Sequence, residues 1–350
     1  MAALFAEIGG RAKDYSDRTV TSIFIGGGTP SLLSGEQIGQ LMDRIREQFA
    51  MAQDAEITME VNPGTASAEK LRNFYTAGIN RLSIGMQSAQ AEELKNLGRI
   101  HDFEGFCQVY REAVEAGFTN INVDIMSGLP GQTLASYRDT LEKVLHLEPM
   151  PQHISAYSLI VEEGTPFAAM AERGELPLPE EETERAMYEE TIEVLAKYGF
   201  HRYEISNYAR DGYECRHNVG YWIRRDYLGF GIGAASLIDN VRFQNEKSLG
   251  AYLAHPLESR EEEQTLTVQD RMEETMFLGL RLTRGVSCVD FAEQYGRTVE
   301  EVYGEVIARN VADGLLTVTE RKENQKKDRF LALTKRGLDL SNYVMAQFLF

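Results

Sequence analysis

Four short motifs contain the residue types that could hold a small polar ligand. The run GGGTP at 26–30 exposes backbone N–H and C=O groups with no side chain in front of them. Glu60 and Asp124 each end an apolar run, and a carboxylate accepts hydrogen bonds from a ribose diol or an amine. Gln87 offers a donor and an acceptor, and Arg99 offers a guanidinium suited to a carboxylate. These groups match what a zwitterionic nucleoside requires.

Each motif has a plainer interpretation when it is taken alone. The glycine run could be a tight strand-to-helix connection, and it is neither a Walker loop nor a complete dinucleotide fingerprint, because no lysine follows and its glycines are contiguous. Glu60 could be a strand-end surface residue. The positions of the motifs relative to the predicted strands are therefore the stronger evidence.

Strand-like runs alternate with amphipathic helical patterns through the first half of the chain. Their starts recur every 25 to 39 residues, and the runs lie at 19–25, 56–61, 81–85, 120–125 and 153–157. This spacing is near the roughly 30 residues of a βα unit. It predicts a parallel sheet, open or closed into a barrel, with the chemistry at the carboxyl ends of the strands. All four motifs fall at those ends.

Composition excludes several classes of protein. The 350 residues carry a formal net charge of −18, which argues against a general nucleic-acid binder. No apolar run approaches the roughly 20 residues of a membrane helix, and the N-terminus reads as an amphipathic helix rather than a signal peptide. The three cysteines, Cys107, Cys215 and Cys288, are too widely spaced for a disulfide framework or a local metal site. We therefore expect a cytoplasmic protein.

The last part of the chain has a different pattern. Helical periodicity at 269–282, 287–295 and 298–313 precedes strand-like runs at 315–318 and 330–333 and a final helix. Three helices followed by a two-stranded wing predict a winged-helix-like module. Seven basic and three acidic residues between 320 and 336, which include the polar tip at 320–328, give this region a local charge of +4. DNA binding is therefore one alternative, but a packing or lid domain fits the acidic helix at 298–313 better.

The order and spacing of GGGTP, EVNPGT, RLSIGMQS, LGRIH and DIMSGLPGQT resemble the radical S-adenosylmethionine (SAM) superfamily, in its HemN/HemW branch. The resemblance covers nearly the whole chain. It implies that Gly27, Gly28 and Thr29 meet the methionyl part of SAM and that Arg99 meets its carboxylate. Glu60, Gln87 and Asp124 would hold the remaining polar groups of the nucleoside.

One feature of that superfamily is missing from this sequence. The Cys-x3-Cys-x2-Cys loop that ligates a [4Fe–4S] cluster does not occur, and the run at 19–25 matches the second strand of the family pattern. We therefore expect a partial (βα)6 barrel without its first strand. We also expect no cluster bound by the usual ligands, although a full-length member of the family would carry one.

The segment HNVGYW, which begins at His217, distinguishes the branches of the family. It resembles the HNxxYW pattern of HemW proteins, which are heme chaperones. The imidazole of His217 could ligate heme iron, with Tyr221 and Trp222 as flat apolar surface for the porphyrin. Alternatively, His217 and Asn218 cap a turn while the two aromatic residues belong to the core.

The prediction from the sequence is an α/β protein in three parts. Residues 1–200 form the partial barrel, 201–265 a connecting region with the HNxxYW segment, and 266–350 a winged-helix-like domain. We expect binding of SAM and heme and delivery of heme to acceptor proteins, without nucleic acid. A peripheral membrane contact stays open. The alternatives are an oxygen-independent coproporphyrinogen III oxidase, a winged-helix nucleic-acid binder and an inactive fragment without a cluster.

Overall fold

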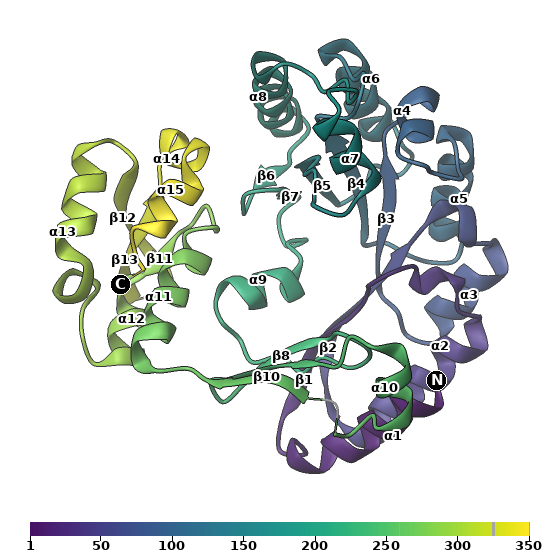
Figure 1. Cartoon of the computed structure of the whole chain (residues 1–350), viewed down its shortest axis with the longest axis horizontal. Coiled ribbons are helices and arrows are strands. Elements are labelled where there is room, and N and C mark those ends of the chain that lie inside the picture. Colours follow the sequence, from purple (N-terminus) through teal and green to yellow (C-terminus); the bar gives the residue numbers. More distant parts are fainter. Residues whose placement is uncertain (259, 324–325, 350) are drawn as a thin grey trace. The chain divides into compact units, whose positions relative to one another are not determined.

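The computed structural model describes residues 1–258, 260–323 and 326–349, and its elements can be followed in Figure 1. The chain forms two compact units. The half-barrel unit comprises Thr19–Arg202 and Ser206–Glu214. The C-terminal unit comprises Met1–Arg18, Tyr203–Ile205 and Cys215–Phe350, so the N-terminal residues belong with the C-terminal part of the chain.

A curled seven-stranded sheet in the order β1-β2-β3-β4-β5-β7-β6 forms the centre of the half-barrel unit. The first five strands are parallel and β7 and β6 are antiparallel to their neighbours. The strands are β1 Thr19–Ile25, β2 Ala50–Val61, β3 Arg81–Gln87, β4 Ile121–Ser127, β5 His153–Ser158, β6 His201–Arg202 and β7 Asn207–Ala209. The predicted parallel α/β half-barrel is confirmed.

Strand β2 begins earlier than the apolar pattern predicts. Residues 50–55 are mostly polar or small, yet Thr19 pairs with Ala50 and Val20 with Met51. A register shift separates these two pairs from the main β1–β2 ladder, which begins at Ser22. Backbone hydrogen bonds make this extension, and they leave no periodic side-chain signal.

Helices cover the outer face of this sheet, as Figure 1 shows. They are α2 Gly35–Gln48, α3 Ala68–Thr76, α4 Ala91–Asn96, α5 Phe103–Glu115, α6 Leu134–Leu145, α7 Pro166–Glu172 and α8 Glu181–Lys197. Leu41, Met42 and Ile45 bury the apolar face of α2, and Ser34 begins that helix with a capping box. Two single-turn 3₁₀ helices, η2 Pro30–Leu32 and η3 Pro63–Thr65, follow β1 and β2.

The C-terminal unit contains a small antiparallel sheet next to the N-terminal helix. Its strands are β8 Ala235–Ile238, β9 Val241–Asn245 and β10 Arg260–Thr265, in the order β10-β9-β8. The associated helices are α1 Ala2–Arg11, η1 Ala12–Asp14, α9 Arg216–Trp222 and α10 Leu249–Ala254. The region that the sequence predicts only as an irregular connection therefore contains a sheet.

The predicted winged-helix-like module is confirmed, with a short third strand in its sheet. Its elements are α11 Val268–Gly279, β11 Val286–Ser287, α12 Cys288–Tyr295, α13 Val299–Ala312, β12 Leu316–Glu323, β13 Lys326–Leu333, α14 Lys335–Asp339 and α15 Ser341–Ala346. Sheet order is β11-β13-β12 around an apolar core that includes Met276, Phe291 and Phe348. Residues 324–325 of the predicted polar tip lie outside the described residues.

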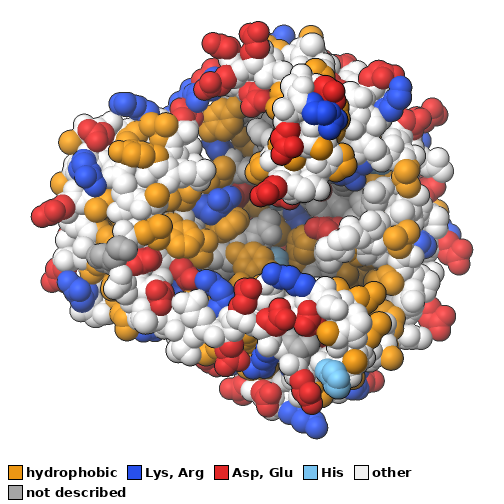
Figure 2. All heavy atoms as spheres, viewed as in Figure 1, with side chains coloured by type: hydrophobic (Ala, Val, Ile, Leu, Met, Phe, Trp, Pro, Cys, Tyr) orange, Lys and Arg blue, Asp and Glu red, His pale blue; other side chains and the backbone are white. Residues whose placement is uncertain are grey.

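Charged side chains of both signs lie on the surface, as the many acidic and basic residues of the sequence lead one to expect. Acidic and basic side chains are interspersed over the face that Figure 2 shows. In the described ranges, no helix is both long and apolar enough to cross a membrane.

Candidate functional site

The glycine run after β1 lies against the end of β2. The N–H of Gly27 donates to the Glu60 carboxylate at 3.2 Å. Gly27 and Gly28 have φ angles of +83° and +63°, and a Cβ added at either would meet no atom within 4 Å. The left-handed conformation explains the choice of glycine, and the open space in front leaves room for a ligand to approach bare backbone.

Burial raises the pKa of the Glu60 carboxyl above its usual value. The N–H of Gly27 lowers that pKa in part, and the negative charge of Asp124 raises it further. The Glu60 carboxyl on β2 is thus within electrostatic range of Asp124, which lies on β4 two strands away. A cationic group placed beside Glu60 would favour its ionised form.

Gln87 ends β3 in a strained conformation. It is buried, with 4% of its surface exposed, and its φ is +69°. The β3–β4 pairing shifts register between Gly85 and Gln87, which turns the Gln87 side chain out of the regular ladder. A non-glycine residue with positive φ and a buried amide is typical of a functional position.

Tyr157 on β5 contacts one of the predicted site residues. No feature of the local sequence distinguishes this tyrosine from others in strands. Its hydroxyl donates to Oε1 of Gln87 at 3.0 Å. Burial raises the pKa of that hydroxyl most, and the charge of Asp124 raises it further. The Gln87 bond and the Arg99 charge lower the pKa, and the Glu60 charge raises it. Tyr157 thus contacts Gln87 directly and lies within electrostatic range of Glu60, Arg99 and Asp124.

A hydrogen-bond chain across β3, β4 and β5 holds the Asp124 carboxylate. Nδ2 of Asn122 donates to Asp124 at 2.6 Å and to Oγ of Ser83 at 2.7 Å. Oδ1 of Asn122 accepts from Ser155 at 3.1 Å and lies 2.6 Å from Nδ1 of His153. Burial raises the pKa of Asp124, although the Asn122 bond opposes the shift. The chain orients the carboxylate, and the charge of Arg81 also opposes the rise of its pKa.

Arg99 follows α4 and its side chain is half-buried. Among the described residues, its guanidinium has no hydrogen-bond or ion-pair partner. Nearby, Nε2 of His101 lies 3.4 Å from the carbonyl oxygen of Met86, and burial lowers the pKa of this imidazole. An arginine whose guanidinium has no carboxylate partner within the described protein can bind the carboxylate of a ligand.

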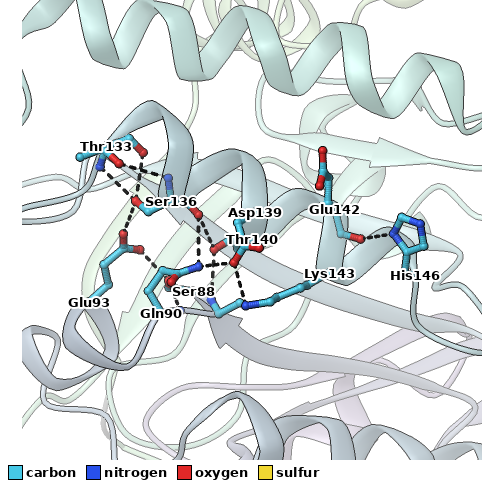
Figure 3. A network of polar contacts seen from close by, with 11 residues as sticks. Ser88, Gln90, Glu93, Thr133, Ser136, Asp139, Thr140, Glu142, Lys143 and His146 are labelled. Atoms are coloured by element: carbon cyan, nitrogen blue, oxygen red, sulfur yellow. Dashed lines mark hydrogen bonds and ion pairs between the residues drawn. The ribbon is translucent and has the colours of Figure 1, made fainter.

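The carboxylate of Glu93 on α4 connects Ser88, which directly follows β3, with Gln132 of the GLPGQT segment and Ser136 on α6. This carboxylate, 5% exposed, accepts from Ser88 at 2.6 Å, from Gln132 at 3.0 Å and from Ser136 at 2.6 Å. Figure 3 shows Ser88, Glu93 and Ser136 converging there, with Gln90 nearby. The loops after β3 and β4 are thereby held before any ligand binds.

The structure places Gly27, Glu60 and Gln87 at the carboxyl ends of β1, β2 and β3, whereas Asp124 is the middle residue of β4 and Arg99 follows α4. Their donor set fits the polar groups of SAM: carboxylates for an ammonium and a ribose diol, and a guanidinium for a carboxylate.

Thr29 and Gly28 occupy the same loop as Gly27. Gly28 is exposed, and the carbonyl of Thr29 accepts the N–H of Leu32 at the start of η2. Their roles toward a ligand stay predictions.

His217 is the second residue of α9 in the C-terminal unit. Its Nε2 is 3.1 Å from the hydroxyl of Tyr221 one helical turn later, and the two rings meet edge to face at 4.8 Å. Tyr221 in turn contacts Tyr227, with ring centroids 4.6 Å apart. The guanidinium of Arg281 lies 4.3 Å from the Trp222 ring centre, so one face of that ring is already covered.

The described residues do not fit an iron–sulfur cluster. Cys215 is buried in the C-terminal unit, Cys288 lies on α12 and Cys107 on α5 of the half-barrel unit. Within the described part of the chain, no group of three histidine, cysteine or acidic side chains could hold a metal ion.

Comparison with known proteins agrees with this geometry. The family described as the Radical SAM superfamily matches residues 4–144, and the HemN C-terminal domain family matches residues 266–340. The solved structure of coproporphyrinogen III oxidase (HemN) from Escherichia coli aligns with a TM-score of 0.83 and 26% identity, over 99% of this chain and 82% of that one. Fold and site thus define a radical SAM-type protein with a HemN-type C-terminal domain.

Relatives of known sequence place the chain more narrowly. The heme chaperone HemW of Bacillus subtilis is 39% identical over 94% of this chain and 85% of its own length. The heme chaperone HemW of Lactococcus lactis is 36% identical over 96% of this chain and 86% of its own. The chain belongs to the HemW family.

Proposed function

We propose that the half-barrel unit binds SAM at the carboxyl ends of β1 to β5. Gly27, Gly28 and Thr29 contact the methionyl part, and Glu60 accepts hydrogen bonds from its ammonium. Arg99 binds the carboxylate of the ligand. The observations that support this arrangement best are the hydrogen bonds that orient its polar groups: Gly27 to Glu60, Tyr157 to Gln87 and Asn122 to Asp124.

The nucleoside part occupies the opposite side of the site in this proposal. Asp124 accepts hydrogen bonds from the ribose hydroxyls, and Gln87 contributes its amide. The Asn122 chain and the Tyr157 bond keep both side chains oriented, so little order has to be gained when the ligand binds.

We propose further that the chain carries heme and delivers it to acceptor proteins, as the name of its relatives indicates for them. His217 supplies the iron ligand. A half-buried imidazole on α9, beside the rings of Tyr221 and Tyr227, offers a nitrogen donor with aromatic surface next to it. The hydroxyl of Tyr221 has to release Nε2 before that nitrogen can bind iron.

Heme titration followed by the Soret band tests this assignment. We expect His217→Ala to weaken binding by about tenfold or more. His255→Ala is the matched control, because His255 lies in the same unit with a side chain 69% exposed. Tyr221→Phe removes the competing hydroxyl and should bind heme at least as tightly as the unmodified chain. Equal affinity of the His217 variant and the unmodified chain would remove His217 from the site.

Oxidation of coproporphyrinogen III is the second candidate function, favoured by the 0.83 TM-score to HemN. The two functions differ in what happens to the porphyrin: a chaperone returns heme unchanged, whereas the oxidase alters propionate side chains. Incubation of the heme-loaded chain with apomyoglobin as a probe acceptor, and titration of the chain with coproporphyrinogen III, separates them. We expect heme transfer and no binding of coproporphyrinogen III; the reverse result would favour the oxidase.

A further inference from the structure

Lys70 near the start of α3 binds three backbone carbonyls from two different loops. Its ammonium donates to the carbonyl oxygens of Ser31 at 2.9 Å, Leu32 at 3.3 Å and Thr65 at 3.2 Å. Two of these residues belong to η2 and the third ends η3. Carbonyls at the end of a short helix lack intrahelical donors, so one ammonium satisfies both turns.

Ser31 joins the same two turns through its side chain. It is fully buried, and its Oγ accepts the N–H of Asn62 at 3.0 Å. The hydroxyls of Ser31 and Thr65 share a hydrogen bond of 2.6 Å. Together with the Lys70 bonds, these contacts hold η2 and η3 rigidly against each other.

The GGGTP loop spans the gap between β1 and η2. Its first end is fixed because Ile25 pairs with Met59 in the sheet. Its second end continues into η2. The two glycines with positive φ, Gly27 and Gly28, lie between these ends, where the N–H of Gly27 also donates to Glu60. Glycine loses more conformational freedom on ordering than other residues, so a loop of this kind needs both ends held.

We propose that Lys70 is a positioning residue for the methionyl end of SAM. It acts through η2 and holds the glycine loop in the conformation that presents bare backbone to the ligand. The proposal rests on the SAM site proposed above and extends it to a residue that does not touch the ligand.

Two ligands distinguish this role from general structural support. SAM carries the methionyl group, whereas 5′-methylthioadenosine keeps the adenosine and the sulfur but lacks the amino-acid part. Calorimetric titration of the full chain with each should show Lys70→Met weakening SAM by about tenfold while methylthioadenosine binds unchanged. Lys70→Arg retains a cation with several donors and should restore most of the SAM affinity. Lys95→Met is the control, since Lys95 is exposed on α4.

Hydrogen exchange of the unliganded chain supplies a second readout. Amides in the peptide 24–33 should exchange faster in Lys70→Met, while the peptide 124–133 from the loop after β4 stays unchanged. Equal losses for both ligands would indicate a general structural role and overturn the proposal, as would unchanged exchange at 24–33. An unmodified chain that binds neither compound would overturn the SAM assignment itself, whereas SAM binding insensitive to Lys70→Met would overturn only the role of Lys70.

Discussion

At the scale of single residues, the candidate site contains carboxyls whose ionisation the protein itself opposes. Burial raises the pKa of Glu60 and of Asp124, and the negative charge of Asp124 raises the pKa of Glu60 further. A ligand that brings an ammonium and hydroxyl donors favours the ionised form of both carboxyls, and perturbed carboxyls of this kind often mark binding sites.

Glu60 should make SAM binding depend on pH. The carboxylate is the form that accepts from the ammonium, so affinity should fall as pH drops through the raised pKa of Glu60, above the 4.5 of an ordinary glutamate. Glu60→Gln should bind about tenfold more weakly at pH 7.5 and lose most of this dependence. Calorimetry from pH 5 to 8 measures it, with exposed Glu92→Gln as control. A pH profile identical in both variants would contradict the role of Glu60.

Asp124→Asn should stabilise the fold while it weakens SAM binding. A carboxyl with a raised folded pKa binds more protons in the native state, so its contribution to stability falls as pH rises through that pKa. At pH 7 the variant should gain about 0.5–2 kcal/mol, and the gain should shrink as pH approaches the ordinary value of 3.8. Thermal unfolding of the variant and the unmodified chain at pH 7 and close to pH 3.8 measures this gain in stability. Loss of stability at pH 7 would show that the hydrogen bonds of Asp124 outweigh its burial.

At the scale of elements, hydrogen bonds from a buried ion pair within α1 attach that helix to the small sheet of the C-terminal unit. Glu7 has no exposed surface and lies 3.2 Å from the guanidinium of Arg11. Its carboxylate also accepts from Gly231 at 2.9 Å, Tyr252 at 2.7 Å and Asn245 at 2.7 Å. The attachment explains why residues 1–18 group with a part of the chain more than two hundred residues away.

Glu7→Gln should therefore be strongly destabilising. It leaves the Arg11 guanidinium, 3% exposed, without its counter-charge, at a cost of about 3–5 kcal/mol. The double variant Glu7→Leu with Arg11→Met removes both charges and should lose less than the single variant. Urea unfolding measures both. A double variant less stable than Glu7→Gln would indicate that the hydrogen bonds, rather than the unpaired charge, dominate.

At the scale of the whole molecule, the proposed ligands bind different compact units. The proposed SAM residues all lie in the half-barrel unit, and His217 lies in the C-terminal unit. Each unit has its own sheets and apolar core, so each can unfold as a cooperative body. Ligand binding should then stabilise only the unit that contains the site.

Differential scanning calorimetry of the full chain should resolve two transitions. SAM at 100 times its Kd should stabilise one of them by about 2.7 kcal/mol, and heme should raise the other. His217→Ala should abolish the heme shift and leave the SAM shift intact. A single transition that responds to both ligands would show that the two units unfold as one body.

Local sequence determined the strand ends and the residue types placed there. The apolar run that becomes β1 ends at Ile25, where the glycines begin, and Glu60 and Gln87 lie at the ends of their strands, because strand and glycine signals are properties of neighbouring residues. Asp124 differs: β4 continues to Ser127, so that carboxyl lies in the middle of its strand. The resemblance to the radical SAM superfamily could be stated from these motifs alone.

Tertiary structure decided which side chains support them. Tyr157 meets Gln87 across 70 positions, Lys70 meets Ser31 across 39, and Glu7 meets Tyr252 across 245. None of the three has a distinctive local pattern: a strand tyrosine, a helix lysine and a helix glutamate are ordinary in their own segments. Their roles arise from strand register and loop packing, which depend on contacts that no short stretch of sequence contains.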